Sequence, residues 1–238
     1  MSIVKDSLSK KTLSDEMDLA NLANTRRQVY KLLSTMYLRS PDKKVTRSLS
    51  QFFSEPKTSV FLEKIPENVR KSFLKINSSI KSSGAGQKSL QVDFTNLLRG
   101  FRPNIPPLPP YESVYRGEDR TFGVSTFNVS SEYANADVKI ADEYRGEPPD
   151  HIGIELDFMA HLCRLEAKAW HECDYEKCLE ILKQEKRFLE EHLMIWVFNL
   201  CDQIKNHSRT DFYIGLAEAT ENWVDLDYEQ INAISKSW

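Results

Sequence analysis

The sequence lacks the long apolar run that a membrane-spanning helix requires. Its longest unbroken apolar stretch is the six residues from Leu193 to Phe198, whereas about 20 are needed to cross a bilayer. The N-terminus also lacks the apolar segment of a secretory signal. We therefore expect a protein that resides in the cytoplasm and does not insert into membranes.

Glycine, proline and cysteine are all scarce. The 8 glycines and 10 prolines among 238 residues exclude collagen-like and low-complexity chains. The four cysteines include no Cys-x-x-Cys pair, so we expect no zinc ribbon and interpret them as structural thiols rather than disulfides. The P-loop, the Gly-x-Gly-x-x-Gly fingerprint, the nucleophile elbow and the His-Glu-x-x-His motif are missing too. No common phosphate-binding or hydrolytic motif is therefore present.

Charge is small in total and uneven along the chain. The net charge of -3 argues against general nucleic-acid affinity. Residues 1–131 carry 21 basic and 12 acidic side chains (+9), whereas residues 132–238 carry 11 and 23 (-12). Within the second part, residues 132–157 hold eight acids against Lys139 and Arg145. The uneven charge has two interpretations. Either the protein has two solvated faces of different charge, or the acidic span at residues 132–157 receives a cationic ligand or partner.

What the sequence does contain is helical periodicity. Ser14 can cap a first helix in which apolar residues recur every three or four positions from Leu19 to Met36, before Pro41. The same spacing predicts further helices around residues 45–53, 69–80, 90–98, 133–144, 152–170, 178–200, 212–223 and 228–234. We find no convincing strands or repeats. We expect an all-α fold of eight to ten helices in a single domain at residues 14–238, preceded by a mobile tail at residues 1–13.

Two glycine- and proline-rich segments interrupt this pattern. Residues 82–87 should break a helix, and Gly100 is placed to cap the one before it. Five prolines between positions 103 and 110 exclude regular helix. We predict an ordered loop or hinge over residues 101–116, which could let helices exchange between protomers, so both a monomer and a homodimer remain open.

The segment at residues 147–159, EPPDHIGIELDFM, is the most informative. Asp150 can cap a helix that presents His151 and Glu155 four residues apart on one face. These two side chains could bind a metal or act as an acid and base, with His161 as the other nearby donor, which leaves a helical metal-dependent or nucleotide hydrolase as an alternative function. A structural interpretation also remains, in which Asp150 caps the helix and His151 bonds locally.

Three other groups call for a structural interpretation first. In PPYESVY, Glu112 lies between aromatics directly after rigid chain, and Tyr111 and Tyr115 are expected to pack on a neighbouring helix. His192 and Trp196, one turn apart, are expected to form a core pair. Arg26 and Arg27 superficially resemble a twin-arginine export signal, but charged residues follow too soon, so we expect both on the solvated side of the first helix.

The motif at residues 147–159 resembles that of the TorD/DmsD/NarJ family of redox-enzyme maturation chaperones, approximately E-x-x-D-H-x-x-x-E-L-x-F-M. The matching residues are Glu147, Asp150, His151, Glu155, Leu156, Phe158 and Met159. PPYESVYR also fits the proline and E-S-V-Y segment that precedes the family motif, and FTNLLRG fits its aromatic-leucine-glycine segment. The resemblance extends over most of residues 20–225.

This resemblance implies an all-helical cytoplasmic chaperone without catalytic residues, metal or cofactor. Such a chaperone binds the apo catalytic subunit of a dimethyl-sulfoxide-reductase-type molybdenum enzyme until its cofactor is inserted. Family members commonly recognise the twin-arginine signal peptide and prevent premature export. Asp150, His151 and Glu155 then become candidate peptide contacts, and we add Glu147, Tyr111 and Glu112 from the same two segments. We expect charge to select the peptide and apolar burial to supply most of the affinity.

Overall fold

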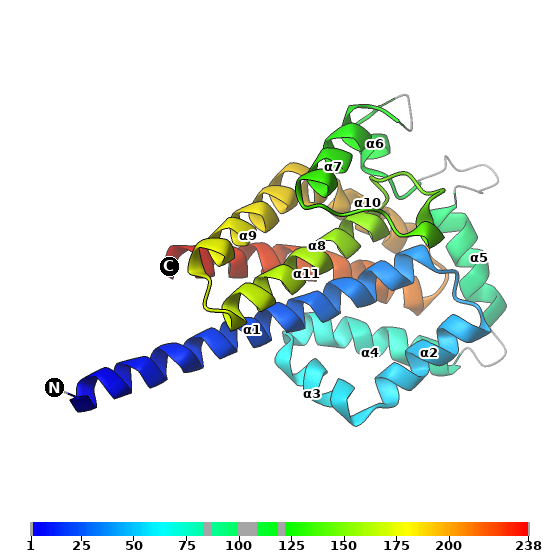
Figure 1. The fold of residues 1–238 in the computed structure, drawn as a ribbon. Helices are drawn as coiled ribbons and strands as arrows, with labels where there is room; N and C mark the ends of the chain where they lie inside the picture. The colour runs from blue at the N-terminus through cyan, green and yellow to red at the C-terminus, as the bar shows by residue number, and fades with distance from the viewer. Residues whose placement is uncertain (1, 83–86, 100–108, 119–121, 238) are drawn as a thin grey trace.

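A computed structural model describes the chain at residues 2–82, 87–99, 109–118 and 122–237 (Figure 1). The described residues are almost entirely helical and contain no strand, only one isolated antiparallel bridge between Tyr111 and His151. The all-α expectation is therefore confirmed. Residues 83–86 of the break predicted at residues 82–87, the Gly100 cap and residues 101–108 of the expected loop lie outside the described residues.

The helices follow one another with short connections. Their bounds are α1 (Ser2–Leu38), α2 (Lys43–Ser54), α3 (Pro56–Lys64), α4 (Glu67–Ser82), α5 (Gln87–Leu98), α6 (Glu112–Tyr115), α7 (Val124–Asn135), α8 (Ile152–His171), α9 (Tyr175–Phe188), α10 (Met194–His207) and α11 (Asp211–Ser237). A π-helical turn (Leu189–Leu193) joins α9 and α10 into one continuous helix, and Asp142–Tyr144 form a short 3-10 turn. Counted in this way, the described residues hold ten helices, within the predicted range.

The long helix α1 organises the molecule. Its C-terminal part packs along α8, and α8 packs in turn against α9 (Figure 1). The last helix, α11, packs on both α4 and α10. None of the helices in the described part of the chain is long and apolar enough to span a bilayer.

Several helix ends have local causes that the sequence shows. The side chain of Asp42 accepts a hydrogen bond from the Val45 N–H at the start of α2, at 2.8 Å. Asp174 does the same for the Lys177 N–H at the start of α9, at 3.1 Å. Both are typical N-cap contacts, and the helix predicted to open at Asp174 is confirmed.

Other predicted ends were wrong. The first helix begins at Ser2 rather than at Ser14; the mobility of residues 1–13 remains a prediction. Helix α3 was not predicted, and the two helices expected at residues 212–223 and 228–234 are one continuous helix, α11. No glycine or proline lies between the two predicted helices, at residues 224–227, so nothing in the local sequence ends the helix there.

The helix predicted over residues 133–144 was wrong at both ends, because α7 begins at Val124 and stops at Asn135. Asp137 adopts a left-handed conformation with φ of 54°, and the Val138 N–H bonds back to the Tyr133 carbonyl at 2.9 Å. This arrangement is a Schellman-type helix end. It turns residues 138–144 away from the axis of α7, where they become one wall of the groove described below.

Arg26 is the clearest departure from expectation. Its side chain is fully buried, not solvated, and its guanidinium contacts Glu166 of α8, Glu185 of α9 and Asp227 of α11. Burial alone would disfavour its charge, yet the carboxylates, Asp227 above all, raise the pKa of Arg26 well above its usual value. Burial in turn raises the pKa of Glu185 to about 8, against the attraction of Arg26. These ion pairs thus connect α1 to α8, α9 and α11 through one buried cation. The neighbouring residue, Arg27, is exposed as predicted.

Gly153 allows α1 and α8 to approach closely. A Cβ atom at this position would lie 2.5 Å from Cγ of Leu38, closer than real side chains pack. The absence of a side chain therefore brings the C-terminal end of α1 against the first turn of α8.

Candidate functional site

The motif segment pairs with the segment after the prolines. The Glu112 N–H donates to the Asp150 carbonyl at 3.0 Å, and the Ile152 N–H donates to the Pro110 carbonyl at 2.9 Å. These two bonds form the antiparallel bridge between Tyr111 and His151. Residues expected to contact a peptide from two separate segments are thus brought together by backbone pairing.

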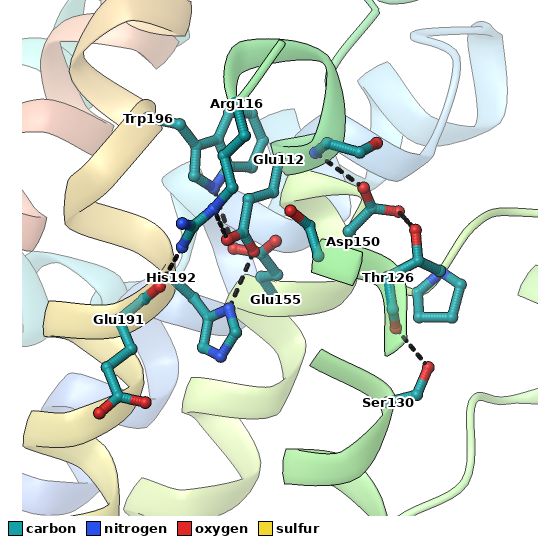
Figure 2. A network of polar contacts seen from close by, with 12 residues as sticks. Glu112, Arg116, Thr126, Ser130, Asp150, Glu155, Glu191, His192 and Trp196 are labelled. Carbon is teal, nitrogen blue, oxygen red and sulfur yellow. Dashed lines mark hydrogen bonds and ion pairs between the residues drawn. The ribbon is translucent and has the colours of Figure 1, made fainter. Parts of the chain in front are cut away.

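Asp150 does not cap α8, contrary to prediction. Its carboxylate instead accepts hydrogen bonds from the Ser113 N–H at 3.0 Å and from the Thr126 hydroxyl at 3.3 Å (Figure 2). Ser113 lies in the first turn of α6, where backbone N–H groups have no helical acceptor. Asp150 therefore joins α6 and α7 to the start of α8.

His151 is the actual N-cap of α8. Its Nδ1 atom accepts a hydrogen bond from the Gly153 N–H at 3.0 Å, which confirms the interpretation that His151 bonds locally. Burial lowers the pKa of His151 to about 4, although the charge of Glu147 opposes the shift. The imidazole is therefore neutral at pH 7, as its acceptor role requires.

Glu155 and Glu112 approach each other inside the protein (Figure 2). Burial, followed by the charges of Glu112 and Asp150, raises the pKa of Glu155 well above its usual value and so favours its protonated form. The Trp196 indole N–H donates to Glu155 Oε2 at 3.3 Å. A neutral acid is the form that a buried, partly paired carboxyl group favours.

Glu112 connects α6 to the π-helical turn. Its carboxylate contacts Arg116 Nε on one side and His192 Nδ1 on the other, the second at 2.9 Å. Arg116 also donates to the backbone carbonyl of Glu191. His192 and Trp196 are both buried, so the predicted core pair is confirmed, with the ring nitrogen of His192 engaged by Glu112.

Glu147 and Tyr111 are the two candidates that reach the surface. Tyr111 Oη donates to Glu147 Oε2 at 3.2 Å, and Arg99 pairs with the same carboxylate. Burial and the neighbouring charge of Glu147 raise the pKa of Tyr111 to about 12. Burial acts against ionisation of Glu147, but Arg99 outweighs it and lowers its pKa.

The acidic residues that were expected to contact a cationic partner do not form an exposed patch at the start of α8. Asp150, His151, Glu155 and Glu112 are each no more than 1% exposed. Five other acids of the 132–157 span already have internal ion-pair partners, namely Glu132 with Arg187, Asp142 with Arg145, Glu143 with Arg39, Glu147 with Arg99 and Asp157 with Lys31. Within the described residues, Asp137 has no such partner. Most of the negative charge in this span is therefore neutralised within the chain.

An accessible hollow nevertheless lies beside the motif. It has a volume of about 180 Å³ and lies between the end of α1, the end of α7, residues 138–144 and the first turns of α8. We call it the apolar groove. Its apolar lining residues are Leu38, Tyr133, Val138, Ile140, Ala141, Tyr144, Ile154 and Phe158, and its polar ones are Lys139, Asp157 and His161.

Comparison with known proteins identifies the family of this chain. Residues 62–202 match the family model described as nitrate reductase delta subunit. The chain belongs to this family. It is the family of redox-enzyme maturation chaperones that the motif suggested, so the resemblance is confirmed.

Curated relatives carry chaperone names. The chain is 22% identical to the chaperone protein TorD of Shewanella piezotolerans over 229 residues, which cover 92% of this chain and 99% of that protein. It is 29% identical to TorD of Colwellia psychrerythraea over 83 residues, which cover 35% of this chain and only 29% of that protein. A probable Tat proofreading chaperone DmsD from Haemophilus influenzae is 26% identical over 147 residues, covering 59% of this chain and 65% of that protein. These family members are chaperones and not enzymes.

Sequence reasoning missed most of the groove. Ile154, Asp157, Phe158 and His161 all face it from α8. Their spacing is i, i+3, i+4 and i+7, which marks one face of a helix, so this signal was available in the sequence. The contributions of Leu38 and of residues 138–144 come from other segments and had no local signal.

The residues of the alternative metal site are not brought together in the described part of the chain. In the part of the chain that is described, one trio of potential ligands comes close enough, Cys163, Glu166 and Glu185, and all three are buried. Arg26 supplies the positive charge between these acids. His151, Glu155 and His161 are not brought together as such a group among the described residues, and the Nδ1 atom of His151 is already an acceptor.

Proposed function

We propose that this chain is a cytoplasmic chaperone for the apo catalytic subunit of a dimethyl-sulfoxide-reductase-type molybdenum enzyme. It binds the twin-arginine signal peptide of that subunit, delays its export and holds it until the cofactor is inserted. The family membership and the chaperone names of the relatives support this role. The apolar groove beside the motif is the observation that supports peptide binding.

Energetics favour the groove over the acidic span as the main source of affinity. Micromolar binding requires about 8 kcal/mol, whereas exposed ion pairs contribute roughly 0 to 1 kcal/mol each. At about 25 cal/mol per Å², some 300 Å² of buried apolar surface would supply this amount, and the peptide's loss of freedom raises the area needed. In the groove, an apolar stretch of a signal peptide would bury its own apolar surface against Leu38, Ile154 and Phe158.

Asp157 is the acid best placed to receive a guanidinium of the peptide. It lines the groove and is 35% exposed, and it pairs with Lys31, whose side chain is 60% exposed, at 2.6 Å. Because an exposed pair of this kind contributes little to stability, an incoming arginine can replace Lys31 at low cost. Asp157 thus takes over the role that the sequence assigned to Asp150 and Glu155.

The buried motif residues have a positioning role in this proposal. Asp150, His151, Glu155 and Glu112 hold α6, α7 and the π-helical turn against the start of α8. Tyr111 and Glu147 remain candidates for contact with the peptide because they are partly exposed. Direct contact of the peptide with Asp150, His151 or Glu155 stays a prediction, and it would require the α6 segment to move.

The test is calorimetric titration of the purified chain with a twin-arginine signal peptide. Val138→Asp places a charge in the apolar groove and should weaken binding by at least about tenfold. Val60→Asp is the matched control, because Val60 is 54% exposed on α3, away from the groove. Equal affinity of both variants and the unmodified chain would contradict peptide binding in the groove.

A further inference from the structure

Helix α7 carries exposed apolar side chains that the proposed function does not use. Phe122, directly before the helix, is 77% exposed, and Val124 and Phe127 in its first turns are 70% and 71% exposed. Among the large apolar side chains of the described residues, these three are the most exposed. Apolar side chains that gather in this way on a surface indicate an interaction site. Helices α6 and α7 lie together at one edge of the molecule, where a partner can reach them (Figure 1).

These side chains belong to a second face of α7, separate from the one that packs on the protein. The inner face consists of the buried residues of the helix, which are Ser125, Thr126, Val129 and Tyr133. The outer face consists of residues spaced by three or four positions, which are Val124, Phe127, Ser131 and Ala134. We call these four residues, together with Phe122, the outer α7 face. The contacts of the fold are therefore satisfied without it.

The outer α7 face is uncharged. Asn128 and Asn135, which flank it, are neutral as well, and Glu132 is the one charged residue of the helix. Glu132 pairs with Arg187 of α9 at 2.7 Å, so its charge is compensated within the chain. A strongly charged partner gains no ion pair on such a face, whereas a second copy of the chain meets it without repulsion between like charges.

The order of large and small side chains on this face suits pairing with itself. In a two-fold symmetric interface, each residue lies opposite a different residue of the second copy. If two α7 helices pack antiparallel with the symmetry axis beside position 129, Phe127 faces Ser131 of the second copy and Val124 faces its Ala134. Each large side chain then meets a small one, which lets the two helices interdigitate.

The exposed apolar area is of the size that a dimer needs. At about 200 Å² for a fully exposed phenylalanine and somewhat less for a valine, Phe122, Val124 and Phe127 together present roughly 400 Å² per copy. Two copies then bring together about 800 Å² of apolar surface. Specific interfaces bury roughly 1,600 Å² in total, of which somewhat more than half is apolar. Two outer α7 faces therefore supply most of the apolar part of such an interface.

We propose that the chain forms a two-fold symmetric homodimer through the outer α7 face, with antiparallel α7 helices at its centre. This dimer differs from one formed by exchange of helices, because each copy keeps all of its own helices. No residue of the outer α7 face lines the apolar groove. Both grooves of the dimer therefore stay open, and the inference does not rest on the proposed function.

Sedimentation equilibrium of the full chain, from micromolar to near-millimolar concentration, tests this dimer. The unmodified chain should pass from monomer to dimer in the micromolar range, and high salt should not weaken the association, because the face is uncharged. Phe127→Glu should weaken the dimer by at least about tenfold, since it buries an unpaired charge from each copy. Val60→Glu is the matched control, at an exposed apolar position of α3, and should dimerise as the unmodified chain does. Circular dichroism should show the same fold for both variants, because both positions are exposed.

The orientation is tested by oxidative cross-linking in a Cys173→Ser background, which removes the exposed thiol. Asn128→Cys lies beside the symmetry axis and should form a disulfide between two copies, whereas Ser48→Cys, at an exposed position of α2, should not. A monomer at every concentration overturns the inference, and any loss of client binding by Phe127→Glu would then assign the face to the client. A dimer that Phe127→Glu leaves intact also overturns it, because another face or helix exchange would hold the copies together.

Discussion

The carboxylate of Asp150 accepts a hydrogen bond from the backbone N–H of Ser113 at 3.0 Å, and both residues are buried. The two are 37 residues apart in the chain. This bond anchors the short helix α6 to the motif at the start of α8. It makes Asp150 a residue that joins elements of the fold, and it changes what a substitution there should do.

Asp150→Ala should lower the free energy of unfolding by about 1–3 kcal/mol, because it leaves the Ser113 N–H buried without its acceptor. Asp142→Ala is the matched control, since the Asp142–Arg145 pair is almost fully exposed and contributes little. Urea denaturation followed by circular dichroism measures both changes. Equal unfolding midpoints for the two variants would contradict a buried role for Asp150.

The neutrality of His151 should make stability depend on pH. Its pKa in the folded protein is about 4, below the ordinary value of 6.5, so the unfolded chain binds more protons between these two values. The contribution of His151 is therefore complete above about pH 6.5 and is lost as the pH falls toward 4, with a magnitude of the order of 3 kcal/mol. His151→Asn keeps an N-cap acceptor but does not titrate. The difference in unfolding free energy between the two proteins should shrink as the pH falls, and a constant difference would contradict this account.

Glu155 should show the opposite dependence. Its pKa lies well above the ordinary 4.5 when the protein is folded, so the folded state keeps a proton that the unfolded chain releases. The unmodified protein should therefore lose stability relative to Glu155→Gln as the pH rises above about 4.5. Glu172→Gln, at an exposed position, should follow the unmodified protein at every pH. Parallel urea denaturations from pH 4 to pH 8 test this, and identical slopes for all three proteins would contradict it.

Removal of the buried cation should be among the most damaging changes. Arg26→Met keeps much of the side-chain volume but leaves Glu166, Glu185 and Asp227 without their positive partner. Breaking a buried ion pair in this way costs about 3–5 kcal/mol. Arg27→Met, at the exposed next position, should change the unfolding free energy by about 0.5 kcal/mol or less. Thermal and urea unfolding measure the stability of both variants. Equal stability of Arg26→Met and Arg27→Met would refute the claim.

Helix content could be read from the sequence because it depends on local periodicity and local breakers. The positions of α2, α4, α5, α8 and the α9–α10 helix follow from apolar spacing and from side chains such as Asp42 and Asp174. The errors occur where a local rule was incomplete. A left-handed Asp137 ended α7 where apolar spacing still continued.

The candidate site could be located but not described from the sequence. The motif at residues 147–159 indicated the family, which the family model confirms, and the apolar groove lies beside this segment. Its charged residues were expected at the surface, because carboxylates usually are. The structure buries Asp150 and Glu155 against partners from α6, α7 and α10, which lie 24 to 41 residues away in the chain.

The sequence by itself determined the all-α class and the family, because periodicity, caps and motif are properties of neighbouring residues. Only the tertiary structure decided that Arg26 is a core residue, that Asp150 bonds to α6 and that the groove is built from α1, α7 and α8. The physical reason is that burial and partnership depend on contacts between distant segments, and these contacts set whether a charged side chain stabilises the fold or faces a ligand.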